Sequence, residues 1–157
     1  MRVLGIDPGF DRLGVAVMDR DQKNGTLLYS ACVQTDRTHS FEERLGHAGE
    51  AVRALLTTYT PTIVALERLY FNKNQRTAMK VAEMRGTVVY LAELHGCRIV
   101  EYTPQQIKVA VTGYGASDKR QVAAMVARLI PTVHQGALDD EYDAIAVALT
   151  ALASIRP

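Results

Sequence analysis

Residues 2–34 read RVLGIDPGFDRLGVAVMDRDQKNGTLLYSACVQ and contain three apolar runs of strand length. The first run, residues 2–7, ends at a Pro-Gly turn, the second covers residues 13–18, and the third, residues 27–34, follows a polar turn. Short apolar runs separated by Gly, Pro and Asp residues are typical of β-strands joined by tight turns. We therefore predict that the chain begins with an antiparallel three-stranded meander.

Beyond this meander, apolar residues recur at intervals of three and four, as in an amphipathic helix. The pattern starts at Phe41 and ends before Pro61. Ser40 is suited to cap this helix, and Glu43 three residues later completes a capping box. Residues 62–67 then read TIVALE. A near-continuous apolar run of this length is typical of a parallel strand that is buried on both faces.

The rest of the chain continues with the same two patterns. Residues 75–95 predict a long helix with apolar residues on several sides, which would pack against the sheet and against a second surface, of this chain or of another subunit. Residues 97–102 predict a further strand. Three helices would follow, one opened by Pro104, one capped by Ser117 and one over residues 138–154.

These segments predict one α/β domain over residues 1–157. Its mixed five-stranded sheet would combine an antiparallel meander with two parallel strands and carry helices on both faces. A length of 157 residues with 48% hydrophobic and 22% charged residues suits such a domain. No window resembles a membrane span or a signal peptide, so we expect a cytoplasmic protein without a membrane partner. Cys32 and Cys97 are expected to be reduced packing residues.

The formal net charge of +1 conceals an uneven distribution along the chain. Residues 67–130 hold ten basic and five acidic side chains, whereas residues 131–157 hold one basic and four acidic side chains. Either feature alone is most often an ordinary solvated face. Their meaning therefore depends on whether the acids form a site.

Two acids stand at the ends of predicted strands. Asp7 ends the first strand and Glu67 ends the fourth. Taken alone, Asp7 could do no more than organise its Asp-Pro-Gly turn, and Glu67 could begin an exposed loop. If the two strands are parallel neighbours, however, both carboxylates point into one crevice at the sheet edge, where the sites of open α/β sheets lie.

Asp140 and Asp143 are three residues apart at the start of the last predicted helix, so they share one face and benefit from the helix dipole. Helix capping is the simpler role for acids at this position. Four acids brought together repel one another unless cations are bound. Carboxylates without histidine favour hard cations, so Asp7, Glu67 and this pair predict a two-ion Mg²⁺ or Mn²⁺ site for phosphodiester hydrolysis.

Five segments in this order resemble one known family. They are GIDPG with Asp7, ALERLYFNKN with Glu67, AMKVAEMRG, QQIKVAVTGYGASDKRQV, and the pair Asp140 and Asp143 before AIAVAL. Together they resemble the RuvC family of bacterial Holliday-junction resolvases, the crossover junction endodeoxyribonucleases. The resemblance implies an RNase H-like fold and a homodimer that uses Mg²⁺ or Mn²⁺ to nick two strands of a four-way DNA junction symmetrically. The expected products carry 5′-phosphate and 3′-hydroxyl ends, and RuvA and RuvB are the implied branch-migration partners.

The same resemblance assigns roles to individual residues. The four acids named above would be the catalytic and metal-binding acids. Lys108 and Lys119 match family positions implicated in DNA contact and in catalysis, and Lys119 is expected to act with the catalytic acids. Tyr70 occupies the position of an aromatic residue that stacks on bases near the crossover, and the neighbouring Phe71 is the alternative for this role.

The basic segment that follows Glu67 fits this interpretation. It contains Lys73, Asn74, Arg76 and Lys80, which would flank the acidic site. Such side chains bind phosphates and supply affinity without sequence information. An exposed aromatic residue beside them can stack on an unpaired base, whereas a core position below the helix is the other role open to it.

Two other functions stay open from the residues alone. One is a nuclease of the same fold that cuts RNA–DNA hybrids or other structured nucleic acid, and the other is a non-catalytic junction-binding module. Comparing cleavage of a four-way junction with that of a hybrid duplex separates the first, and binding without nicks would indicate the second. The four histidines, His39, His47, His95 and His134, lack metal-ligand spacing and are expected to be surface or packing residues.

Overall fold

The computed structural model describes residues 1–20, 25–68, 75–134 and 136–155. At its centre is one five-stranded sheet with the order β3-β2-β1-β4-β5. The strands are β1 Arg2–Asp7, β2 Arg12–Asp19, β3 Thr26–Gln34, β4 Ile63–Glu67 and β5 Arg98–Tyr102. The first three strands form the antiparallel meander, β4 runs parallel to β1, and β5 runs parallel to β4. The predicted mixed sheet is therefore confirmed.

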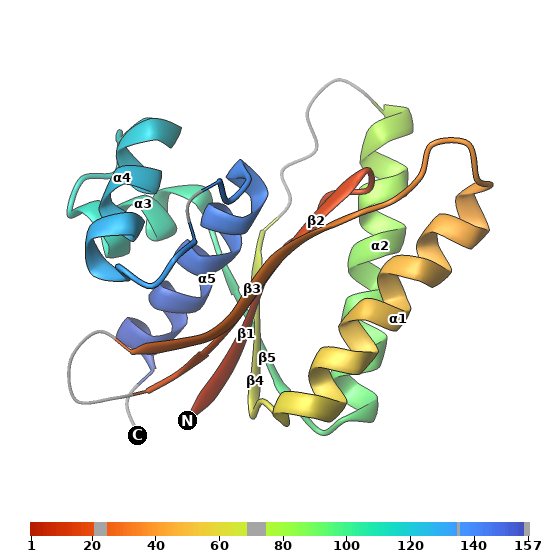
Figure 1. Ribbon diagram of the computed structural model, residues 1–157, viewed down its shortest axis with the longest axis horizontal. Helices are drawn as coiled ribbons and strands as arrows, with labels where there is room; N and C mark the ends of the chain where they lie inside the picture. The colour runs from red at the N-terminus through yellow and green to blue at the C-terminus, as the bar shows by residue number, and fades with distance from the viewer. Residues whose placement is uncertain (21–24, 69–74, 135, 156–157) are drawn as a thin grey trace.

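Helices cover both faces of this sheet (Figure 1). The helices on one face are α1 Phe41–Tyr59 and α2 Gln75–Leu94; those on the other are α3 Pro104–Thr112, α4 Lys119–Leu129 and α5 Asp139–Ser154. α5 packs directly on β1 and β2, while α3 and α4 pack on α5. This three-layer arrangement confirms the predicted α/β fold class, and it makes α5 the helix closest to the middle of the sheet.

Side-chain caps set the starts of three of these helices, α1, α3 and α4. In α1 the Ser40 hydroxyl accepts from the Glu43 amide at 3.2 Å, and the Glu43 carboxylate accepts from the Ser40 amide at 2.8 Å, as predicted. The prediction that Ser117 caps α4 is wrong. Asp118 is the N-cap, and its carboxylate accepts from the Gln121 amide at 2.8 Å. The reason is that Asp118 has a Gln three residues further on, which allows the reciprocal capping box that Ser117 lacks.

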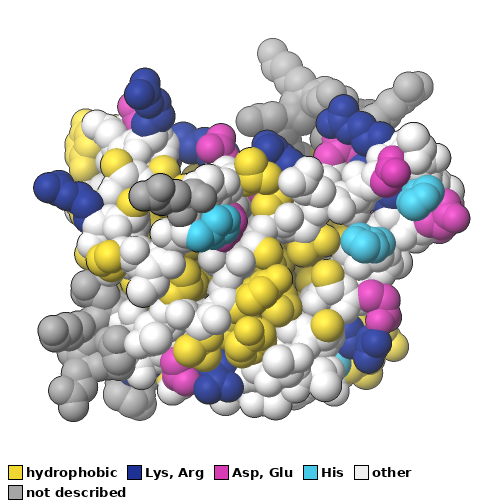
Figure 2. Space-filling model, in the orientation of Figure 1, with side chains coloured by type: hydrophobic (Ala, Val, Ile, Leu, Met, Phe, Trp, Pro, Cys, Tyr) yellow, Lys and Arg dark blue, Asp and Glu magenta, His cyan; other side chains and the backbone are white. Residues whose placement is uncertain are grey.

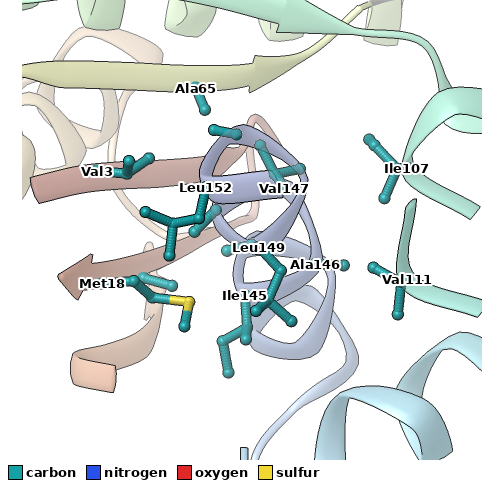
Figure 3. Packing of buried hydrophobic residues seen from close by; sticks show 14 of the residues in the cluster. Val3, Met18, Ala65, Ile107, Val111, Ile145, Ala146, Val147, Leu149 and Leu152 are labelled. Carbon is teal, nitrogen blue, oxygen red and sulfur yellow. The ribbon is translucent and has the colours of Figure 1, made fainter. Parts of the chain in front are cut away.

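Side chains alternate along the strands and build a hydrophobic core on each face. On β1, Leu4 and Ile6 are fully buried on the side of α1 and α2, whereas Val3 belongs to the core around α5. Figure 3 shows α5 in this second core, between Val3 of β1 and Ile107 of α3. Each fully buried large side chain contributes about 1.5–3 kcal/mol, so packing holds α5 firmly against the sheet.

Two glycines let α5 approach the sheet unusually closely. A side chain on Gly5 of β1 would overlap the main-chain carbonyl of Ala144 and the side chain of Ala148. A side chain on Gly14 of β2 would overlap the carbonyl of Asp140. The small residues at these contacts therefore determine how closely α5, including its acidic first turn, packs against β1 and β2.

The exposed apolar surface lies on an edge strand and on α2. β3 ends the sheet, and hydrophobic side chains gather over it in Figure 2; Leu28 and Tyr29 are each 39% exposed. On α2, Met79, Tyr90 and Leu94 are exposed. None of the helices in the described part of the chain has the length and apolar content needed to cross a membrane.

Candidate functional site

Asp7 and Glu67 are the last residues of β1 and β4. These strands are parallel neighbours, with Ile6 opposite Leu66, so the two acids leave the sheet at the same edge. Two residues before Glu67, Ala65 belongs to the core around α5. Because side chains alternate along a strand, Glu67 lies on the same side of the sheet as Ala65. The predicted juxtaposition of the two strand ends is therefore present.

The start of α5 brings the other two acids to this place. Asp140 lies in the first turn of α5, and Asp143 follows three residues later. Asp7 is opposite Gly14 in the β1–β2 register, and Gly14 is the residue that lets the Asp140 carbonyl approach the sheet. Three elements, β1, β4 and α5, thus gather the four predicted acids, as their spacing in the sequence suggested.

The surroundings of this cluster disfavour the charged form of its carboxyl groups. Burial, followed by the negative charges of the other three acids, raises the pKa of Asp7 to about 7. Burial and then Asp143 raise the pKa of Glu67. Burial also raises the pKa of Asp143, although Lys119 beside it acts in the opposite direction. These raised pKa values show that the carboxylates repel one another in a buried place, and a bound cation would relieve the repulsion.

Two basic side chains contact the acids contributed by α5. Lys119 Nζ lies 2.8 Å from Asp143 Oδ2, and Arg12 Nε lies 3.0 Å from Asp140 Oδ2. Among the described residues, Asp7 and Glu67 have no ion-pair partner. Sequence reasoning predicted Lys119 but missed Arg12. The contact of Arg12 could have been indicated only by the β1–β2 register, which brings the start of β2 close to Asp7 at the end of β1.

A pocket of about 220 Å³ opens beside the acids. Glu67, Asp143, Lys108 and Lys119 line it, together with mostly apolar side chains of α3, α4 and α5. Two predicted acids and both predicted lysines thus meet around one hollow. A lining with both signs of charge suits a phosphate group that is held together with cations.

The donor atoms of the cluster decide which cations fit. Within the described ranges, no three Asp, Glu, His or Cys side chains converge closely enough to enclose an ion as they lie. The chemistry of the donors nevertheless fits a hard cation, because carboxylate oxygens favour Mg²⁺ and Mn²⁺, and Asp7 and Glu67 have no ion-pair partner among the described residues. Arg12 and Lys119 form ion pairs with Asp140 and Asp143, two of the acids that would bind such ions.

The two cysteines are both free thiols, as predicted. Cys97 is buried and donates to the Pro61 carbonyl at 3.1 Å. Cys32 Sγ lies 3.9 Å from Asp140 Oδ2, and burial followed by the charge of Asp140 raises the pKa of Cys32 to about 11. Cys32 therefore stays a neutral thiol and does not offer the site a thiolate ligand.

The predicted DNA-contacting segment is described only in part. Tyr70, Phe71, Lys73 and Asn74 lie outside the described residues. Arg76 belongs to α2, but its side chain is not among those described. Lys80, further along α2, lies over two aromatic rings, with Nζ 5.2 Å from the centroid of Phe10 and 5.9 Å from that of Phe41. Its contact with DNA stays a prediction.

Acids at the ends of two parallel strands, two more acids on a packed helix and a pocket lined by lysines are features of the metal-dependent nucleases with an RNase H-like fold. The family model described as crossover junction endodeoxyribonuclease RuvC matches residues 3–151, and the chain belongs to this family. The membership predicted from the five sequence segments is confirmed.

Relatives with this description are similar over nearly the whole chain. The RuvC of Leifsonia xyli subsp. xyli is 40% identical over 150 residues, which are 95% of this chain and 72% of the relative. The RuvC of Brevibacillus brevis is 39% identical over 150 residues, 96% of this chain and 90% of the relative. The structure of Thermus thermophilus RuvC in complex with Holliday junction substrate matches with a TM-score of 0.90 at 32% identity, covering 98% of this chain and 93% of that one.

Proposed function

We propose that this protein is a metal-dependent endonuclease that resolves four-way DNA junctions by hydrolysing one phosphodiester bond in each of two strands. The name of its relatives, crossover junction endodeoxyribonuclease, and the junction bound to the similar Thermus thermophilus protein support this substrate. The observation that carries the proposal is the gathering of four acids from β1, β4 and α5, where burial and mutual repulsion raise the pKa values of Asp7, Glu67 and Asp143.

In this proposal Asp7, Glu67, Asp140 and Asp143 hold two Mg²⁺ or Mn²⁺ ions. When bound, such ions supply activation of the attacking water and stabilisation of the charge that develops on the phosphate and the leaving oxygen. The carboxylates contribute by holding oxygen donors at fixed places on three packed elements, which limits the reorganisation needed during the reaction.

The two lysines that line the pocket would bind the phosphate beside the acids. Lys108 and Lys119 line the same hollow as Glu67 and Asp143. Their ammonium groups bind phosphate oxygens and so place the scissile bond against the acids. Lys119, which contacts Asp143, also neutralises charge close to the reacting phosphate and is the catalytic lysine of this proposal. Cleavage leaves 5′-phosphate and 3′-hydroxyl ends.

The segment after Glu67 and the start of α2 would hold the DNA next to the site. The proposed contacts are Tyr70 or Phe71 stacking on a base near the crossover, and Lys73, Asn74, Arg76 and Lys80 binding phosphates. This placement is supported by the position of Glu67 itself, since the segment leaves the sheet directly from an active-site acid.

Two symmetric nicks require two active sites, which a homodimer provides. The exposed residues Met79, Tyr90 and Leu94 lie on one side of α2, together with the exposed Glu83 and with Gly86, which faces open space and leaves room for a second backbone. We propose this face as the dimer contact. A single domain over residues 1–157, a cytoplasmic location and cooperation with RuvA and RuvB complete the proposed function.

A synthetic mobile four-way junction, labelled in turn on each of its four strands, tests the proposal. We expect paired nicks at symmetric positions in two opposite strands with Mg²⁺ or Mn²⁺ and none in the presence of a chelator. Equal or faster cleavage of an RNA–DNA hybrid of the same length would assign the fold to a different substrate. Tight junction binding with no nicks under either ion would contradict the enzymatic function.

A further inference from the structure

The first turn of α5 carries another acid, Glu141, that the proposed mechanism does not use. Glu141 is only 2% exposed. A buried carboxylate is costly unless hydrogen bonds compensate it, and an apolar side chain of similar size would usually fill such a place more cheaply. Glu141 also adds negative charge next to the acidic cluster. Its presence therefore calls for an explanation other than packing.

The contacts of Glu141 join three separate parts of the chain. The Ser30 hydroxyl, on β3, donates to Glu141 Oε1 at 2.6 Å. The ring nitrogen Nδ1 of His134, in the loop before α5, lies 3.3 Å from the same oxygen. One carboxylate oxygen thus ties the start of α5 both to the edge strand of the sheet and to the loop that leads into the helix.

The start of α5 depends on contacts of this kind because it lacks a side-chain cap. Its N-cap residue is Leu138, and no side chain makes a capping hydrogen bond there. Capping, the simpler role for acids at this position, is therefore not what they do. Cys32, two residues after Ser30 on the same side of β3, makes a second contact with this turn through Asp140. β3 thus holds the helix start from one side.

Because of the helical geometry, the contacts of Glu141 also affect the orientation of the neighbouring acids. Successive residues of an α-helix are about 100° apart around its axis. A hold on Glu141 therefore sets the direction in which Asp140 and Asp143 point. Gly14 sets how close this turn comes to the sheet, and the packing of Ala144 and Ala148 against Gly5 orients the body of the helix, so the contacts of Glu141 act on the first turn itself.

We infer that Glu141 is a positioning residue that uses Ser30 and His134 to set the rotation of the first turn of α5, so that Asp140 and Asp143 face the acids of β1 and β4. The inference rests on the proposed function, because it takes those acids as metal ligands. Glu141 itself touches neither substrate nor ion. Groups that orient metal ligands in this way commonly matter almost as much as the ligands.

The test compares Glu141→Ala with Glu141→Gln in calorimetric titrations of the 157-residue chain with Mn²⁺ alone. Glu141→Ala removes the hold, so we expect Mn²⁺ affinity to fall by about 10-fold to 100-fold. Glu141→Gln keeps an oxygen that accepts from the Ser30 hydroxyl and is expected to retain most of the affinity. Ser30→Ala is expected to lie between the two. Junction affinity measured in a chelator should be unchanged in all three variants.

Thr150→Ala is the matched control for a general loss of stability. Thr150 is 1% exposed in the same helix, and its hydroxyl donates to the Ala146 carbonyl within that helix. Its removal should lower thermal stability but leave Mn²⁺ affinity unchanged, because it is far along α5 from the acidic turn.

The outcomes separate this inference from the function on which it rests. Absence of Mn²⁺ binding by the unsubstituted protein would overturn the proposed metal site, and the inference with it. Normal binding by the unsubstituted protein and by Glu141→Ala would overturn the inference alone. Equal losses in Glu141→Gln and Glu141→Ala would also overturn it, since charge rather than position would then matter. If Glu141→Ala does not fold, Ser30→Ala decides: affinity equal to that of Thr150→Ala contradicts the positioning role.

Discussion

Two groups of acids in this molecule have opposite surroundings. The guanidinium of the buried Arg44 contacts the Asp11 carboxylate, and Arg2 donates to Asp19 at 2.9 Å. The hydrogen bond from Arg44 lowers the pKa of Asp11; burial opposes the change at Asp19, but Arg2 and the N-terminal ammonium still lower its pKa. At the proposed active site, burial and neighbouring carboxylates raise the pKa of Asp7 to about 7.

This difference in pKa distinguishes acids that stabilise the folded protein from acids whose charged form destabilises it. An acid whose charged form gains partners on folding adds to the free energy of unfolding, whereas an acid whose charged form is disfavoured on folding reduces it. Asp11 and Asp19 are satisfied within the chain. Asp7 and its neighbours gain most from cations that the chain does not supply, as expected of groups placed for a reaction.

The largest expected effect is on activity. Asp7→Asn removes a charged oxygen donor from the centre of the acidic cluster, so we expect junction cleavage to fall more than about 10³-fold, or about 4 kcal/mol in the activation free energy. Single-turnover cleavage of a labelled four-way junction in Mg²⁺ measures this loss. Asp11→Asn, the matched change in the other group, should cleave at nearly the normal rate. Cleavage by Asp7→Asn at a comparable rate would remove Asp7 from the site.

Asp7→Asn should stabilise the folded protein although it abolishes most of the activity. In the absence of divalent ions at pH 8, Asp7 is largely charged in a buried place beside other carboxylates, and the neutral amide removes this repulsion. We expect Asp7→Asn to raise the free energy of unfolding by about 1–3 kcal/mol. Urea unfolding in a chelator measures the change. A less stable Asp7→Asn would mean that the charge of Asp7 is compensated in the folded protein, as it is for Asp11.

Asp11→Asn should lower stability where Asp7→Asn raises it. The buried Arg44 loses its charged partner, and because nearly half of the Asp11 side chain is exposed, we expect a loss of only about 1 kcal/mol at pH 7. The folded-state pKa of Asp11 lies below that of the unfolded chain, so its contribution is present above about pH 4 and is lost as the pH falls through the folded pKa.

Urea unfolding between pH 7 and pH 3 checks this dependence. The stability gap between the unsubstituted protein and Asp11→Asn should be constant down to about pH 5 and should shrink below about pH 4. Arg37→Gln is the control, since Arg37 is the exposed partner of Asp11 and should cost less than about 0.5 kcal/mol. A gap that widens in acid would contradict the assignment of Asp11 to the stabilising group.

The sequence was informative where the signal is local. Asp7 and Glu67 end apolar runs that form adjacent parallel strands, and Asp140 and Asp143 have helical spacing, so their meeting could be predicted. The cap of α4 was misplaced by one residue, because Ser117 and Asp118 are both good capping residues and only the reciprocal partner Gln121 distinguishes them.

Arg12 and Glu141 could not have been found in the same way. The contact of Arg12 with Asp140 depends on the β1–β2 register and on how closely α5 approaches the sheet, and that of Glu141 with Ser30 depends on the start of α5 lying beside β3. These are tertiary quantities that no run of residues encodes locally. The sequence therefore predicted the acids that we propose as metal ligands and missed Arg12 and Glu141, whose contacts lie beside them.

The smallest expected effect concerns Arg12, the one arginine that contacts an acid of the active-site cluster in the described part of the chain. Its side chain is 47% exposed, so its ion pair with Asp140 is weak and competes with any cation for that carboxylate. Arg12→Gln should therefore strengthen Mn²⁺ binding about 3-fold in calorimetric titration, less than 1 kcal/mol. Arg37→Gln, which removes one of the two arginines that contact Asp11 outside the site, should leave Mn²⁺ affinity unchanged. Weaker binding by Arg12→Gln would show that the arginine orients Asp140 rather than competing for it. Asp140 would then combine the features of both groups, held by an arginine like Asp11 and yet used for metal binding like Asp7.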